Sequence, residues 1–124
     1  MTASKTIRQE APIDVSVLEK LAQDVDAAII PKLIEISLKD GSERLAQIKS
    51  ALASSDDTAL VAAIHALAGN AGSCGLMELS HILNECEKSF RRDDTEGGRA
   101  YAVRALALAP SAFELLSDYL RSLD

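Results

Sequence analysis

The sequence predicts an all-α fold, an antiparallel four-helix bundle with an additional short N-terminal helix, and three observations favour it. Apolar residues recur at helical spacing along most of the chain, and no stretch alternates as a half-buried strand does. Aromatic residues make up only 3%, so aliphatic side chains must fill the core, which suits closely packed helices. The expected links between helices are short, which places consecutive helices side by side.

The first helices are expected after a flexible tail. Residues 1–12 show no apolar periodicity, so the bundle domain is expected over residues 13–124. An apolar series starts at Val15 and continues past Pro31, which is expected either to break the helix or to occupy the first turn of a second piece. The Asp-Gly-Ser run at 40–42 combines a glycine stop with a serine N-cap, and predicts a helical hairpin with a short link.

The next two helices have clear start and stop signals. The Ser-Asp-Asp run at 55–57 offers side-chain acceptors and negative charge to a helix N-terminus, and predicts a helix from about residue 57 to about residue 73. Gly75 is expected in the following turn. Residues 76–90 place apolar side chains on one face of a fourth helix, and the polar run at 91–98 is expected to end it.

A last helical stretch is expected from Arg99 onward, since apolar residues again recur at helical spacing. Pro110 is expected to break or kink it before the final apolar series, because a proline inside a helix removes a backbone hydrogen bond and clashes with the preceding turn.

The charge balance and the two cysteines limit the partners and the setting. With 13 Lys and Arg against 19 Asp and Glu, the net charge of −6 predicts no nucleic-acid or anionic-membrane partner. Residues 58–77 carry no charged side chain, but their small and polar residues make a membrane span unfavourable. Cys74 and Cys86 are expected to be free thiols, which favours a reducing cytoplasm.

His65 is the candidate reactive residue. At about 100° per residue, it falls at the boundary between the buried stripe of its helix and solvent. Glycine inside a helix costs about 1 kcal/mol relative to alanine, so the two glycines nearby require a reason. Either they permit close helix packing, or they let a second protein reach the imidazole. The small neighbours of His65 are Ala62, Ala68, Gly69 and Gly72.

Residues 65–75, His-Ala-Leu-Ala-Gly-Asn-Ala-Gly-Ser-Cys-Gly, followed by Leu79, resemble the signature of the histidine-containing phosphotransfer (HPt) family. A looser resemblance covers about residues 15–122. It implies a four-helix bundle that relays phosphoryl groups between aspartates of response-regulator receiver domains, with His65 as the phosphoacceptor. It also implies that the receiver supplies Mg²⁺, so no cofactor and no metal are expected on this chain.

One position departs from this resemblance. The family usually has a lysine three residues after the histidine, where it can lie beside the phosphoryl oxygens, and this chain has Ala68. A cation from another helix would compensate for its absence, and the candidates are Lys88, Arg91 and Arg92.

The remaining reactive side chains have simpler interpretations. His81 is expected on the exposed face of its helix, and a metal site with Glu78 or Glu85 has little support from one exposed helix. Cys86 falls in the apolar stripe and is expected in the core. Cys74, in the turn beside a glycine, is expected to be the more reactive thiol.

The sequence therefore predicts a monomeric, cytoplasmic phosphocarrier of a two-component phosphorelay, rather than a true enzyme. His65 exchanges phosphoryl groups with a receiver domain or a hybrid histidine kinase, and Ala62, Ala68, Gly69 and Gly72 form the access and docking surface around it. One alternative is a docking module that binds a receiver or kinase without carrying phosphate. A third hypothesis is a structural helical adaptor with an unrelated partner.

Overall fold

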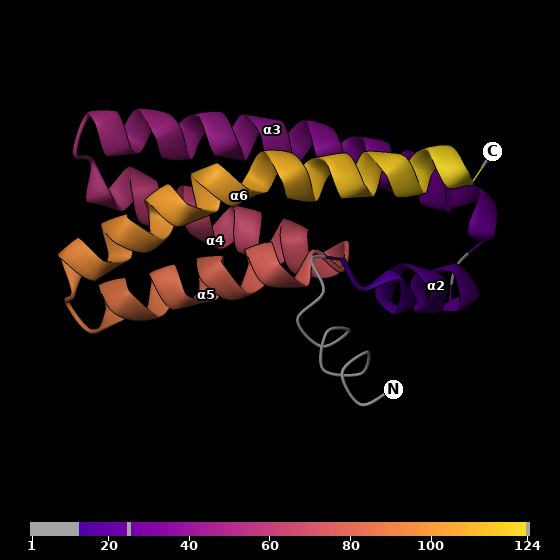
Figure 1. Ribbon diagram of the computed structural model, residues 1–124, viewed down its shortest axis with the longest axis horizontal. Coiled ribbons are helices and arrows are strands. Elements are labelled where there is room, and N and C mark those ends of the chain that lie inside the picture. Colours follow the sequence, from indigo (N-terminus) through magenta and orange to yellow (C-terminus); the bar gives the residue numbers. More distant parts are fainter. Residues whose placement is uncertain (1–12, 25, 124) are drawn as a thin grey trace.

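The computed structural model describes residues 13–24 and 26–123, and it confirms the predicted all-α bundle. A short helix, α2 (Val15–Asp24), and a 3-10 turn, η1 (Ala27–Ile29), come first. The predicted flexible tail, residues 1–12, lies outside the described residues. Four long helices then run antiparallel to one another (Figure 1): α3 (Ile30–Ala53), α4 (Asp57–Ser73), α5 (Met77–Arg91) and α6 (Thr95–Ser122).

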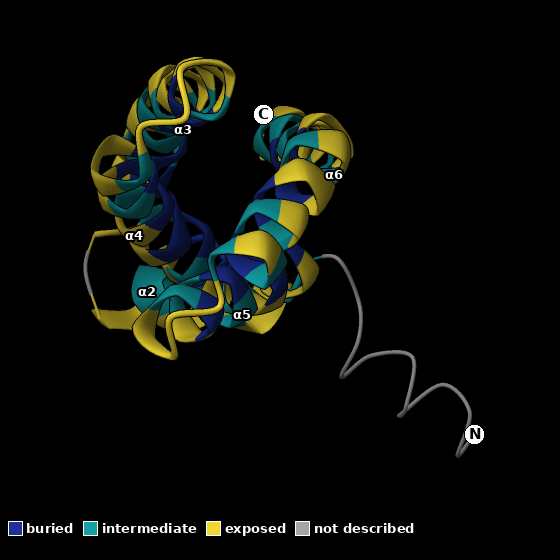
Figure 2. Ribbon diagram, turned by 90° about the vertical axis from the view of Figure 1, so that its left-hand side faces the viewer, coloured by how far each residue is buried: buried dark blue, intermediate teal, exposed yellow. Residues whose placement is uncertain are grey.

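The core is aliphatic, as the composition predicts. Figure 2 looks along the bundle and shows the buried stretches of the four long helices turned towards its centre. In the described part of the chain, no helix combines the length and the apolar character that a bilayer span requires. The largest fully buried side chains are Leu18, Ile34, Ile48, Leu60, Ile64, Leu67, Leu76, Leu79, Leu83, Cys86, Ser89 and Leu116.

The predicted hairpin at residues 40–42 is wrong, because α3 is one continuous helix. Gly41 is buried inside it, and a Cβ atom there would lie 2.8 Å from the Phe113 ring of α6. The glycine makes room for this ring and does not reverse the chain. Pro31 lies in the first turn of α3, where a backbone N–H has no partner within the helix, so a proline there costs no hydrogen bond. This agrees with the second of the two expectations for Pro31.

The last helix also differs from the prediction. It starts at Thr95 instead of Arg99, because Asp94 caps its N-terminus through a hydrogen bond from the Gly97 N–H to Asp94 Oδ1 of 2.9 Å. Of the two expectations for Pro110, the break is wrong, because the helix continues through it to Ser122.

The bounds of α4 agree with the prediction. Asp56 caps the helix, since its Oδ1 accepts a hydrogen bond of 3.1 Å from the Ala59 N–H. Gly75 follows in the turn with φ of +76°, a left-handed conformation that favours glycine. The Asp14 N–H donates a hydrogen bond of 2.6 Å to the Gly75 carbonyl, so the residues before α2 are fastened to the turn between α4 and α5.

Candidate functional site

His65 lies on the outer face of α4, opposite the side chains that fill the core. Its side chain is 79% exposed, well beyond the boundary position that the helical periodicity predicts. Its neighbour Ile64 and the nearby Leu67 are fully buried and hold this helix against the bundle. The core therefore fixes the backbone of α4 and leaves the imidazole open to solvent.

The predicted docking surface is only partly on the exterior. Ala62 and Gly69 are exposed and Gly72 is half-buried, so all three lie at the surface near His65. Ala68 does not, since it is 7% exposed and belongs to the core. A step of three residues turns a helical side chain about 60° away from the starting one. This rotation relative to His65 is enough to place the Ala68 side chain in the core of the bundle.

The two glycines do not serve close helix packing. A Cβ atom on Gly69 would meet nothing within 4 Å, and one on Gly72 would meet only Ser80 Oγ, at an ordinary contact distance of 3.5 Å. Of the two explanations that the sequence allows, packing is therefore excluded for Gly69. The open surface beside His65 remains as the explanation.

A carboxylate orients the imidazole. His65 Nδ1 lies 2.9 Å from Glu87 Oε2 of α5, and the Glu87 side chain is only 17% exposed. A carboxylate that accepts a hydrogen bond from Nδ1–H leaves Nε2 without a proton and with a free lone pair. Nε2 is then the ring nitrogen whose lone pair is free to react.

An amide holds α3 and α4 together on the other side of His65. Asn70 Nδ2 donates hydrogen bonds to the Ser37 carbonyl, at 2.9 Å, and to Asp40 Oδ2, at 3.0 Å. These groups line a shallow hollow together with His65. Ile36, on the rim of the same hollow, is 53% exposed and offers an apolar contact to a partner.

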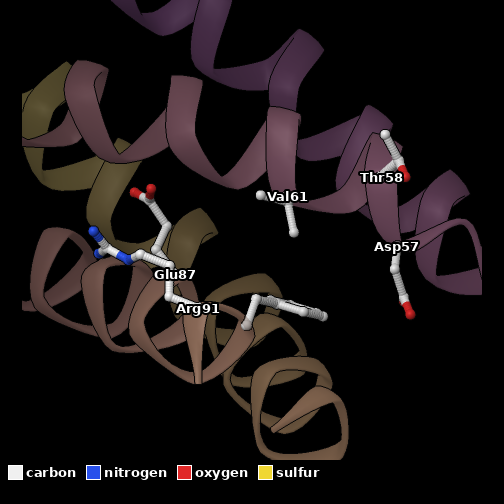
Figure 3. Close-up of a pocket in the computed structure, with 6 residues that line it drawn as sticks. Asp57, Thr58, Val61, Glu87 and Arg91 are labelled. Atoms are coloured by element: carbon white, nitrogen blue, oxygen red, sulfur yellow. The ribbon is translucent and has the colours of Figure 1, made fainter. Parts of the chain in front are cut away.

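A second groove lies between α4 and α5, and Figure 3 shows its lining. It is open, has a volume of about 440 Å³, and has Val61 and Phe90 as its apolar walls. Asp57 also lines it, and forms a two-pronged ion pair with Arg99 through hydrogen bonds of 3.0 Å each. Glu87 belongs to this groove as well as to the His65 pair, so the groove reaches the imidazole.

The three candidate cations differ in their surroundings. Lys88 Nζ lies 3.3 Å from Glu85 Oε2, one turn away on α5. Arg92 is exposed and is the C-cap residue that follows α5. Arg91 is exposed and lines the groove with Glu87.

The other reactive side chains lie apart from this site. His81 is exposed, as predicted. Cys86 is in the core, as predicted, and burial raises the pKa of its thiol to about 12. Cys74 is also buried, and burial raises the pKa of its thiol, which disfavours the reactive thiolate at this position too. Across residues 13–24 and 26–123, no three His, Cys, Asp or Glu side chains gather as a metal site requires.

Comparison with known proteins agrees with this geometry. The Hpt domain family matches residues 32–124. The crystal structure of histidine-containing phosphotransfer protein B (HptB) from Pseudomonas aeruginosa PAO1 is similar, with 25% sequence identity and a TM-score of 0.74. The match covers 90% of this chain and 93% of that one. No curated protein sequence matches the chain.

Proposed function

Since the chain belongs to the Hpt domain family, whose members are histidine phosphotransfer modules of phosphorelays, we propose that His65 is its phosphoacceptor. It receives a phosphoryl group from a receiver-domain aspartate or a hybrid histidine kinase and passes it to another receiver. The single observation that supports this most is the exposed imidazole held through Nδ1 by a largely buried carboxylate.

In the proposed transfer, the Nε2 lone pair attacks phosphorus and the bond from phosphorus to the aspartyl oxygen breaks. The aspartate leaves as a carboxylate, and the ring keeps its proton on Nδ1. The imidazole gains positive charge as the bond from nitrogen to phosphorus forms, and Glu87 stabilises that charge from 2.9 Å away. Such a transfer depends on positioning and charge neutralisation, which explains how one oriented side chain suffices.

The partner supplies what the chain does not. The Mg²⁺ that neutralises the phosphoryl oxygens comes with the receiver domain, and the bundle domain of residues 13–124 contributes the imidazole and its surface. The exposed Ala62, Gly69 and Ile36 lie where a receiver would approach. We extend the proposal to a monomeric protein that acts in the cytoplasm on proteins rather than nucleic acid, consistent with the net charge of −6.

A docking module that carries no phosphate is the second candidate, and the observation that favours it is Ala68. The position where relatives usually have a lysine is neutral and buried here. Receiver binding without phosphoryl transfer would follow if no other cation replaced it.

The test compares His65→Gln with His81→Gln. Each variant is incubated with a phosphorylated receiver domain and Mg²⁺, and the acid-labile, base-stable label on the chain is counted. We expect no label on His65→Gln, full label on His81→Gln, and the same thermal midpoint for both, because both side chains are exposed.

Label that persists in His65→Gln, or disappears in His81→Gln, would assign the reaction to another residue. Tight receiver binding with no label on the unmodified chain would favour the docking module instead.

A further inference from the structure

A partly enclosed cavity lies between α2, α3 and α4. Its volume is about 290 Å³, and its apolar walls include Leu18 and Leu21 of α2 and Leu33 and Ile34 of α3. Leu18 and Ile34 are buried, and the other two side chains are half-buried. Because voids larger than a water molecule are few in a packed protein interior, a space of this size between aliphatic side chains has room for a small molecule.

The helix that closes this cavity lies outside the Hpt family match, which begins at residue 32. Figure 1 shows α2 at the end of the bundle where α4 ends and α5 begins. The Asp14 N–H, directly before α2, donates a hydrogen bond of 2.6 Å to the Gly75 carbonyl, and Leu18 is fully buried beneath the helix. These contacts hold α2 over the cavity without filling it. The cavity is therefore a feature that this helix adds to the bundle.

The polar side chains that Ser37, Ser73 and Cys74 contribute to the cavity are neutral. Burial raises the pKa of the Cys74 thiol, so this thiol keeps its proton at neutral pH. Ser73 Oγ donates a hydrogen bond of 2.8 Å to the Gly69 carbonyl, and its lone pairs can accept a hydrogen bond from a ligand. An uncharged hydrogen-bonding group suits these partners, whereas the net charge of −6 disfavours an anion.

The volume and the lining together define the class of ligand. An apolar cavity of about 150 Å³ holds one benzene molecule, so a cavity of about 290 Å³ has room for about ten carbon and oxygen atoms. Leucine and isoleucine walls gain most from an aliphatic chain, because each CH₂ group that enters removes further apolar surface from water.

We propose that the cavity between α2, α3 and α4 binds a neutral aliphatic molecule of about eight to ten carbon atoms, with its hydrogen-bonding end at Ser37 or Ser73. Both serines also line the hollow beside His65, so the bound molecule lies next to that hollow. The binding itself involves no phosphoryl chemistry. It is therefore independent of the proposed function.

The test uses the full chain and 1-octanol as the probe, with isothermal titration calorimetry as the measurement. We expect saturable binding at one site per chain, with a Kd of about 0.1 mM, as the transfer of an eight-carbon chain out of water implies. Octanoate, which has the same chain and a charged end, should bind at least about tenfold more weakly, because a carboxylate loses its hydration in an apolar cavity. Tighter binding of octanoate would overturn the neutral end of the proposed ligand.

Two matched variants locate the site. Leu33→Phe places a larger side chain at the cavity wall and should weaken octanol binding at least about tenfold, whereas Leu45→Phe, farther along α3 and also half-buried, should bind like the parent. Methyl NMR of the parent gives a second measurement that needs no variant. The methyl signals of Leu18 and Leu21 should shift as octanol is added, and those of Leu106 on α6 should not.

The outcomes decide the proposal in either direction. Saturable binding that Leu33→Phe weakens and Leu45→Phe retains, with shifts confined to the cavity, would support it. Absence of saturable octanol binding, equal binding by the two folded variants, or methyl shifts spread over the whole bundle would overturn it. Because no phosphoryl transfer is measured, each of these results leaves the role of His65 unaffected.

Discussion

Gly69 and Gly98 both lie inside long helices of the bundle, but their surroundings are opposite. A Cβ atom on Gly98 would lie 2.6 Å from the Phe90 ring, so no larger residue fits without displacing that ring. A Cβ atom on Gly69 would have nothing within 4 Å. Each position loses about 1 kcal/mol of helix stability relative to alanine, yet only one of them gains packing within the molecule in return.

This difference separates a glycine that packing within the molecule requires from a glycine that it does not. Gly98, like Gly41 under the Phe113 ring, is explained by its own fold. Gly69 is not, although it lies one turn from His65 on the same exposed face. An empty surface beside the proposed phosphoacceptor is what a docking partner needs. We therefore interpret Gly69 as a position set by the partner and Gly98 as one set by the core.

The largest effect is expected where the core sets the residue. Gly98→Leu should lower the free energy of unfolding by about 3 kcal/mol, because a branched side chain must displace the Phe90 ring. Urea denaturation measures it, with Ala100→Leu on the exposed side of α6 as the control. A Gly98→Leu protein as stable as this control would remove the distinction between the two kinds of glycine.

A smaller loss is expected at the turn after α4. Gly75→Ala should cost about 2 kcal/mol, since alanine is strained at φ of +76° and its Cβ would also meet the Asp14 backbone. Hydrogen exchange at the Asp14 N–H should become faster as its bond to Gly75 is lost. Gly72→Ala, three residues earlier and in ordinary contact, should not lower the free energy of unfolding, because alanine favours the helix, and should leave exchange at the Asp14 N–H unchanged. A comparable loss there would contradict the assignment to the turn.

The smallest effect on stability, and of opposite sign, is expected at the open glycine. Gly69→Leu should raise the free energy of unfolding by up to about 1 kcal/mol, because leucine favours a helix and meets no clash. It should slow phosphoryl transfer from a receiver by about tenfold, equivalent to about 1.4 kcal/mol, by obstructing the surface beside His65. Thermal unfolding and quench-flow labelling give the two values. An unchanged transfer rate would show that docking of a receiver does not require a glycine at this position.

Local signals predicted α4 well and the contacts of glycines poorly. The start of α4 follows from Asp56, whose side chain caps the helix a few residues away, and its end follows from Gly75. Gly41 carries the same local signal of a helix end, but its reason is Phe113, 72 positions later in the chain and on another helix. From local sequence alone, a glycine that ends a helix cannot be distinguished from a glycine that makes room for a side chain of another helix.

The sequence likewise predicted the parts of the candidate site that lie on one helix and not the contacts between helices. Spacing on one helix was enough to find His65 and the small residues around it, but only the resemblance to the HPt signature favoured a functional role for them. The role of Glu87 was not predicted, because its pairing with His65 joins two helices across 22 residues and depends on how they align. Ala68 was included in the access surface as a small neighbour of His65 on the side towards the core, and the packing of α4 against the neighbouring helices buries it.

The chain has two phenylalanines, and each rests on a glycine of another helix, Phe113 on Gly41 and Phe90 on Gly98. The glycine and the phenylalanine of each pair fill one space in the core. A larger residue at the glycine position therefore requires a smaller residue in place of the phenylalanine. Among related sequences, these positions should therefore change together. That coupled variation offers a means of aligning the last helix of distant relatives, where no histidine motif marks the register.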